Sequence, residues 1–270
     1  VTTRLSKNLE PLDLVRVNGR MSIREDVDNI VDDGTPTLGT QGHSVSLTDF
    51  SFTTNDGLVF PVTTLSESYV PARNNQPEKI QIQAKSLDLR TLAKFAEHLP
   101  LPQVQRQMLV DYAPRGQVND FLVQWQGTYP HISSYRVKGN FVGLSMKTPT
   151  VHPAPTQDGT LPVAVPQTAA SGFDNLTGSI DADNHGGSVN LRSAKLKLLL
   201  PGYFSEPAMP FDQLNMRASW SFQQQGQLFG QLQQLDIVQD GLRVSLWGTD
   251  LLPLKPQNGK QRCTIDLAGK

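Results

Sequence analysis

Apolar and polar side chains alternate with a period of two along most of this chain. Met216, Ala218, Trp220 and Phe222 are separated by single polar residues, and similar stretches recur from end to end. Successive side chains of a β-strand point to opposite faces of a sheet, so this period predicts strands with one apolar and one hydrated face. Parallel strands, which are buried on both faces, would show unbroken apolar runs. The sequence therefore predicts a mainly β protein built on an antiparallel sheet.

The alternation changes phase within one stretch. Val189 and Leu191 are odd-numbered, whereas Leu196 and Leu198 are even-numbered. A β-bulge near Ser193-Ala194 would add one residue to the strand and so keep all four side chains on one face.

Two short stretches have helical periodicity instead. Apolar residues recur at three- and four-residue intervals from about 90 to 99, and a second such stretch covers about 103–112. Prolines between them predict a tight helical corner at about 90–112. The segment 148–172 contains five prolines, which is typical of a long exposed loop. Because the strand pattern resumes after this loop, we expect residues 1–270 to form a single segment.

Charge and composition exclude several classes of function. The chain has 24 basic and 25 acidic residues, a net charge of -1, and one cysteine. It therefore has no basic field for nucleic acid, no internal disulfide and no cysteine-rich metal site. No two histidines are three or four residues apart, and the sequence contains no phosphate-binding loop, dinucleotide fingerprint or Gly-x-Ser-x-Gly elbow. We predict no catalytic residue, no metal, no cofactor and no nucleic-acid partner.

Some residues still permit a metal or carbohydrate interpretation. The segment Asp181–Gly186 begins like a calcium loop, but it lacks the later oxygen ligands, so a polar hairpin turn is the favoured interpretation. Paired carboxylates could serve a glycosidase, yet nothing singles out two of them. Trp125 and Trp220 fall within apolar alternation, whereas Trp247 falls on the opposite face from Leu246. The pattern favours a protein that is not an enzyme.

The apolar face of the predicted sheet is too large for the predicted helices to cover. Two short helices cannot shield about a dozen strands. The sheet must fold on itself, pair with a second sheet, or leave an apolar groove open, and an exposed face of this size marks a binding site for an apolar ligand. Alternation alone does not distinguish an open groove from a closed core.

Short motifs follow one another in a specific order along nearly the whole chain. They lie at 87–95, 99–101, 113–118, 121–125, 135–141, 173–180, 186–189, 198–201, 210–212 and 219–220. In this order and spacing they resemble the YhdP proteins, which belong to the AsmA-like group and are related to TamB.

The resemblance implies a fold and a role. The fold would be mainly β, a long curled antiparallel sheet that forms a taco-shaped apolar groove, with two short helices. The chain would be one segment of a larger protein of a Gram-negative bacterium, anchored in the inner membrane through a region outside this chain. That protein would cross the periplasm and carry phospholipid between the inner and outer membranes. The alternatives are a closed β-sandwich with a structural or partner-binding role in the cell envelope, and a glycan-binding or glycan-cleaving β-protein.

The alternating stretches supply the candidate lipid-contacting residues. We expect their side chains to share the concave apolar face, because a register slip of one residue would expose them all. The candidates are Phe121, Val123, Trp125, Leu196, Leu198, Leu200, Met216, Ala218, Trp220, Phe222, Leu235, Ile237, Val244 and Leu246.

Overall fold

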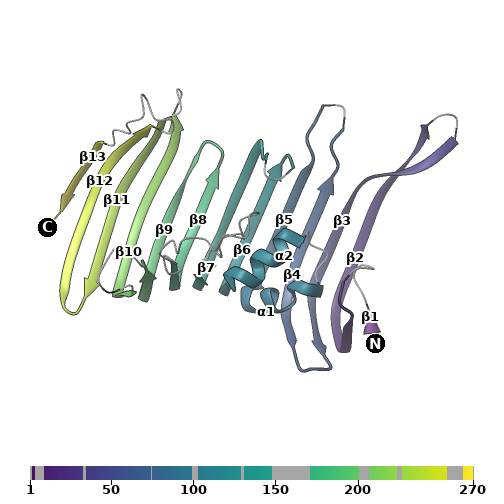
Figure 1. Ribbon diagram of the computed structural model, residues 1–270, viewed down its shortest axis with the longest axis horizontal. Helices are drawn as coiled ribbons and strands as arrows, with labels where there is room; N and C mark the ends of the chain where they lie inside the picture. Colours follow the sequence, from purple (N-terminus) through teal and green to yellow (C-terminus); the bar gives the residue numbers. More distant parts are fainter. Residues whose placement is uncertain are drawn as a thin grey trace, which may run out of the picture.

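A computed structural model shows one antiparallel sheet (Figure 1). It describes residues 2–3, 9–32, 35–73, 75–98, 103–128, 131–147, 171–200, 206, 208–223, 227–253 and 264–269. Within these residues thirteen strands pair in strict chain order, from β1 to β13, without a crossover. The sheet curls but does not close into a barrel. The mainly β, curled antiparallel fold predicted from the sequence is confirmed.

Most strands are much longer than the five or six residues that are usual in globular proteins. Their length follows from the sustained alternation, which continues over many residues of most strands. The bounds are β1 (Thr2–Thr3), β2 (Leu12–Asp32), β3 (Thr35–Thr54), β4 (Val59–Val70), β5 (Lys79–Asp88), β6 (Arg115–Gln126), β7 (Ser134–Lys147), β8 (Gly172–Asp183), β9 (Gly186–Leu199), β10 (Ala208–Gln223), β11 (Gln227–Gln239), β12 (Leu242–Pro253) and β13 (Thr264–Gly269).

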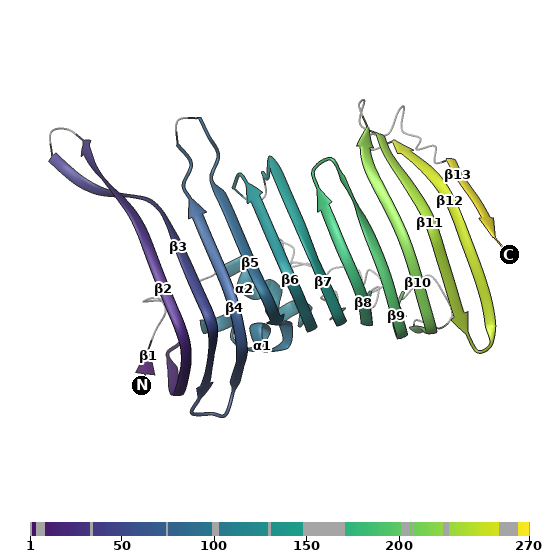
Figure 2. The same cartoon turned by 180° about the vertical axis from the view of Figure 1, so that it is seen from behind.

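Three short helices follow β5 and lie over one face of the sheet (Figures 1 and 2). The Asp88 carboxylate caps the first helix by accepting a hydrogen bond from the Thr91 N–H at 2.7 Å. The helices are α1 (Leu89–Lys94), the 3-10 helix η1 (Ala96–His98) and α2 (Gln103–Tyr112). Both predicted helices are confirmed, and the first is divided at Phe95. The corner at 99–102 and most of the segment 148–172 lie outside the described residues.

Phe95 anchors the helices to the sheet. Its side chain is 1% exposed, and its ring lies 4.9 Å from that of Phe52 and 6.0 Å from that of Phe60. Phe52 and Phe60 are cross-strand partners in β3 and β4, so they point to the same face. Leu12 completes this buried cluster. The helices therefore cover the face that carries Phe52 and Phe60, near one edge of the sheet.

Bulges interrupt the strands along two lines, one through Asp49 and Asp120 and a second, which we call the bulge row, through Gly143, Asn175 and Lys195. Each bulge adds one residue and shifts the phase of the alternation, so Leu191 and Leu196 contribute to one buried cluster. Most positions along the two lines are Asp, Asn or Gly, which tolerate positive φ best. The positive-φ residues are Asp49 (47°), Asp120 (49°), Gly143 (62°), Asn175 (66°) and Lys195 (54°). The bulge predicted near Ser193-Ala194 lies at Lys195.

Side chains replace the ladder hydrogen bonds that the bulges interrupt. The Ser193 hydroxyl accepts a hydrogen bond from the Thr177 N–H at 2.9 Å and donates one to the Thr177 carbonyl at 3.2 Å. The Thr177 hydroxyl accepts from the Gly143 N–H at 3.1 Å, and the Asn175 amide donates to the Ala194 carbonyl at 2.8 Å. Ser193 is thus fully buried without leaving a polar group unpaired.

Candidate functional site

Cross-strand pairing shows that one face of the sheet is continuous from β2 to β12. Residues directly opposite one another in an antiparallel pair point to the same face. Followed from partner to partner, one transverse row passes through Ile23, Val45, Glu67, Ile82, Val123, Val137, Ala182, Gly187, Trp220, Gly230 and Asp250. Glu67 and Asp250 are its charged members. We call this side of the sheet the apolar face.

A second row runs parallel to the first on the same face. Met216 lies four residues before Trp220 in β10, so both side chains point the same way. The row passes through Leu87, Val118, Phe141, Gly178, Leu191, Met216, Leu235 and Leu246. The apolar face is therefore several rows deep as well as many strands wide.

The pairing brings nearly all the predicted site residues onto this face. Met216, Ala218, Trp220 and Phe222 alternate along β10, and Leu235 and Leu246 follow Met216 across β11 and β12. The bulge at Lys195 returns Leu196 and Leu198 to the same side. Further members are Phe121, Val123, Trp125, Ile237 and Val244. Leu200 follows the last residue of β9 and does not belong to the sheet. A lipid-binding role for these residues stays a prediction.

The sequence patterns missed part of the face in β7 and β8. Val137, Ile180 and Ala182 belong to it, but Gly139 and Gly178 occupy the positions between apolar residues there. Glycine carries no side chain, so the alternation is weak in these strands. The longer apolar residues that lie opposite these glycines in the neighbouring strands are the signal that would have identified this part of the face.

Within the described residues, only α1, η1 and α2 lie over the apolar face, where they contact β5, β6 and β7 and, through Phe95, β3 and β4. A closed β-sandwich needs two sheets that face each other. The described strands supply one sheet, so the sandwich alternative is not the observed fold. The apolar face is a single layer, open over most of its width.

Trp220 packs across a glycine on this face. A Cβ atom built on Gly187 would lie 2.6 Å from Trp220 Cζ2 and 2.6 Å from the Ala182 Cβ. Gly187 therefore provides the space in which the indole lies against β8 and β9. The ring covers backbone that would otherwise be exposed to water.

We expect Gly187→Ala to destabilise the chain by about 1–3 kcal/mol, because the new methyl group forces the indole and Ala182 apart. Urea denaturation followed by tryptophan fluorescence measures both the loss and the displaced ring. Gly230→Ala is the matched control: Gly230 pairs with Trp220 in the same row, and its new Cβ would meet only the Asp250 carbonyl, at 3.9 Å. Equal stabilities for the two variants would contradict this packing.

One ion pair lies on the apolar face. His43 Nε2 is 3.3 Å from Glu67 Oε2, and the His43 ring lies 5.3 Å from that of Tyr69. Burial raises the pKa of the Glu67 carboxyl, and His43 opposes that rise. The Tyr69 hydroxyl donates to Glu78 Oε2 at 3.3 Å. These polar groups lie together where the end of β4 pairs with the middle of β3.

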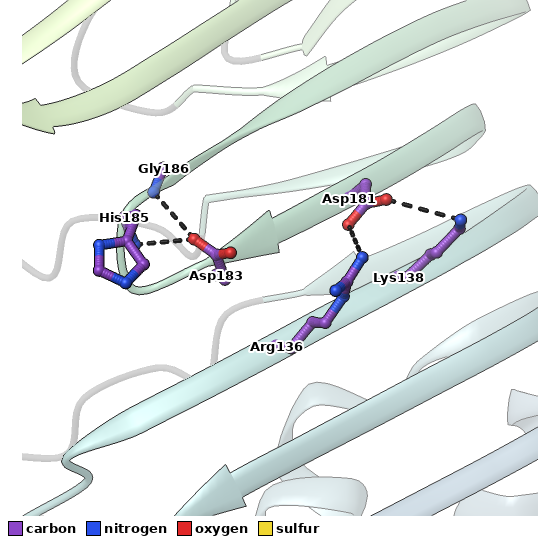
Figure 3. Close-up of polar contacts among 6 residues, drawn as sticks. All are labelled: Arg136, Lys138, Asp181, Asp183, His185 and Gly186. Carbon is purple, nitrogen blue, oxygen red and sulfur yellow. Dashed lines mark hydrogen bonds and ion pairs between the residues drawn. The ribbon is translucent and has the colours of Figure 1, made fainter.

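The opposite face carries the charged residues of the hairpin between β8 and β9 (Figure 3). Asp181 lies 3.5 Å from Arg136 and 3.6 Å from Lys138, both on β7. Asp183 Oδ1 accepts hydrogen bonds from the backbone N–H groups of His185 at 2.8 Å and Gly186 at 3.2 Å. The segment is a polar hairpin turn, as favoured from the sequence, and its carboxylates stabilise the turn and the sheet.

Neither this polar face nor the turn supplies a metal centre. Throughout the ranges described above, no group of three or more His, Cys, Asp and Glu residues could hold a metal ion. A cavity of about 420 Å³ lies beside Asp181, and polar and charged groups such as Lys138, Asn140, Asn190 and Arg217 line it. It offers no long apolar surface, so we place the candidate binding site on the apolar face.

Comparison with known proteins identifies a family for this chain. Among the residues described, no helix is long and apolar enough to cross a bilayer. No curated protein and no solved structure matches the chain. A family model described as YhdP protein matches residues 1–270, which is the whole of it. The chain therefore belongs to the YhdP protein family.

Proposed function

We propose that this chain carries phospholipid along its apolar face, as part of a protein that moves lipid between the inner and outer membranes. The observation that carries the proposal is the unbroken row of mostly apolar residues from β2 to β12, with no second sheet over it among the described strands. Membership of the YhdP family supports it. The chain would work in the periplasm of a Gram-negative bacterium, held to the inner membrane through a region outside it.

The energetics of such transport follow from the geometry. An acyl chain gains about 0.8 kcal/mol for each methylene that it buries. A lipid that moves from one strand to the next exchanges one apolar contact for another, so neighbouring positions differ little in free energy. No covalent step is needed, and we expect no enzymatic activity.

A charge placed on this face tests the proposal. Ala218 lies between Val189 and Leu232 in neighbouring strands and is only partly buried. On an open face water hydrates a new carboxylate, so Ala218→Asp should leave the circular dichroism spectrum and the melting temperature nearly unchanged. The charge is costly to cover with an acyl chain. We therefore expect photo-crosslinking of phospholipid to the intact protein to be abolished, and Leu198→Asp to act in the same way.

Ser219→Asp is the matched control, because Ser219 is the next residue of β10 and points to the opposite face. It should fold and crosslink lipid as the unmodified protein does. If Ala218→Asp fails to fold, the face is a dry core. If it folds and still crosslinks lipid, the lipid path lies elsewhere.

A further inference from the structure

The face opposite the apolar face carries a continuous row of side chains that can form hydrogen bonds. Followed from partner to partner across β6 to β11, the row consists of Asn119, Asn140, Ser179, Asn190, Arg217 and Gln234. Neighbouring strands lie about 4.8 Å apart, so these side chains follow one another over about 24 Å. We call them the polar row.

The cavity of about 420 Å³ beside Asp181 lies over the middle of the polar row. Asn140, Ser179, Asn190 and Arg217 line it. Within the described ranges, the side chains of these four residues form no hydrogen bond or ion pair with another protein group. Donors and acceptors that are left free in a cavity can bind a polar ligand through several hydrogen bonds at once.

The charges around this cavity balance. Two basic residues, Lys138 and Arg217, and two acidic residues, Asp120 and Asp181, line it. Lys138 and Asp181 lie 3.6 Å apart and compensate each other directly (Figure 3). A site for a polyanion would need an excess of cations. The lining therefore favours an uncharged ligand that is rich in hydroxyl and amide groups.

An exposed tryptophan continues the polar row into β12. Trp247 lies opposite the bulge that Gln233 and Gln234 form in β11, and it is 43% exposed. The face of an indole ring carries partial negative charge, so it attracts the weakly positive C–H hydrogens on the flat side of a sugar ring. A single exposed aromatic residue at the end of a row of amides and hydroxyls is the pairing of groups that a carbohydrate needs.

Hydrogen bonds fix the two glutamines beside Trp247. Gln233 Nε2 donates to Ser219 Oγ at 2.7 Å, and Gln234 Nε2 donates to Asp236 Oδ2. Each glutamine keeps its side-chain oxygen as an acceptor for a ligand. Because these side chains are already held in place, binding orders fewer rotamers and costs less entropy.

We propose that the polar row and Trp247 bind an extended glycan strand of N-acetylated sugars. A sugar unit of a β-linked strand is about as long as the spacing between β-strands, so successive sugars meet successive members of the row. Asparagine and glutamine side chains can both donate to and accept from an acetamido group. A protein partner would bury an apolar centre, which the polar row does not offer. The site lies on the face opposite the proposed lipid path and does not depend on lipid transport.

Titration calorimetry of the intact protein with chitohexaose, a β-linked hexamer of N-acetylglucosamine, tests the site. Trp247→Ala should weaken binding about tenfold or more, because the stacking surface is lost. Phe229→Ala is the matched control: Phe229 is 36% exposed on the same face, but it pairs with Ser221 and Leu251, outside the row. Its affinity should stay within about twofold of the unmodified protein. No binding by the unmodified protein, or equal affinities of the two variants, would overturn the site.

The amides and the ligand class are tested in the same way. Asn140→Ala with Asn190→Ala should weaken binding about fivefold or more, since hydrogen bonds to the sugars are lost. Gln81→Ala with Gln83→Ala is the control, because both glutamines lie on the same face in β5 but do not line the cavity. Equal affinities of these double variants would contradict the role of the row. Cellohexaose, which lacks acetamido groups, should bind more weakly than chitohexaose, and equal binding would overturn the assignment to N-acetylated sugars. So would a steep fall in affinity with added salt, which would indicate a polyanion.

Phospholipid crosslinking shows that the two faces act separately. Trp247 points away from the apolar face, so Trp247→Ala should crosslink phospholipid as the unmodified protein does. Loss of crosslinking in this variant would contradict the assignment of Trp247 to a separate glycan site.

Discussion

Replacing Phe95 with alanine is expected to lower the free energy of unfolding by about 3–5 kcal/mol. The Phe95 ring is almost fully buried and contacts Phe52 and Phe60, so its removal leaves a cavity between the helices and the sheet. The helices have few other contacts with the strands. They should therefore detach from the sheet as well as lose stability.

Urea denaturation measures the change, and hydrogen exchange of the amides in α1 reports the detachment. Met108→Ala in α2 is the control: its side chain is 41% exposed, and we expect its effect to stay within about 0.5 kcal/mol. A Phe95→Ala variant as stable as Met108→Ala would show that the aromatic cluster does not hold the helices.

Leu196→Ala is expected to cost about 2–5 kcal/mol in the other half of the sheet. Leu196 is 1% exposed and packs in a cluster with Phe141, Leu191, Phe211 and Leu214, which come from β7, β9 and β10. Truncation removes contacts on both sides of the bulge row at once. The loss should appear as a lower urea midpoint with an unchanged slope, because the amount of surface exposed on unfolding stays nearly the same.

Leu242→Ala is the matched control for this variant. Leu242 begins β12 and is 66% exposed, so the same truncation there should change stability by less than about 0.5 kcal/mol. If the two variants lose equal stability, the cluster around Leu196 is not a packed core.

The sequence predicted the strands and their apolar side because a period of two reports side-chain direction directly. The side-chain direction of Met216, Ala218 and Trp220 could be predicted without knowing which strands pair with theirs. The helices could likewise be predicted from the local spacing of apolar residues. Their docking was not, since Phe95 packs on Phe52 and Phe60, and nothing local to residues 89–98 indicates which strands it meets.

The bulges show a second limit of local patterns. Only the bulge at Lys195 was visible, because leucines flank it on both sides. At Asp120 and Asn175 the residue types that favour positive φ are also those that form turns. One row of aromatic residues was invisible for a related reason: Tyr69, Trp125 and Tyr135 lie in three different strands, and only the pairing places them in one row.

The bulge row also fixes how many residues each strand must have between its bulge and the hairpins at its ends. A single deletion at Lys195 would exchange the two faces for one half of β9, so Leu196 and Leu198 would turn outward while Leu191 stayed in place. Strand β10 keeps constant pairing with β9 on both sides of the bulge, from Ala208 opposite Leu199 to Ser221 opposite Gly186. A length change in one strand therefore has to be matched in its neighbour. Between the bulge row and either hairpin, tolerated insertions and deletions should come in multiples of two residues.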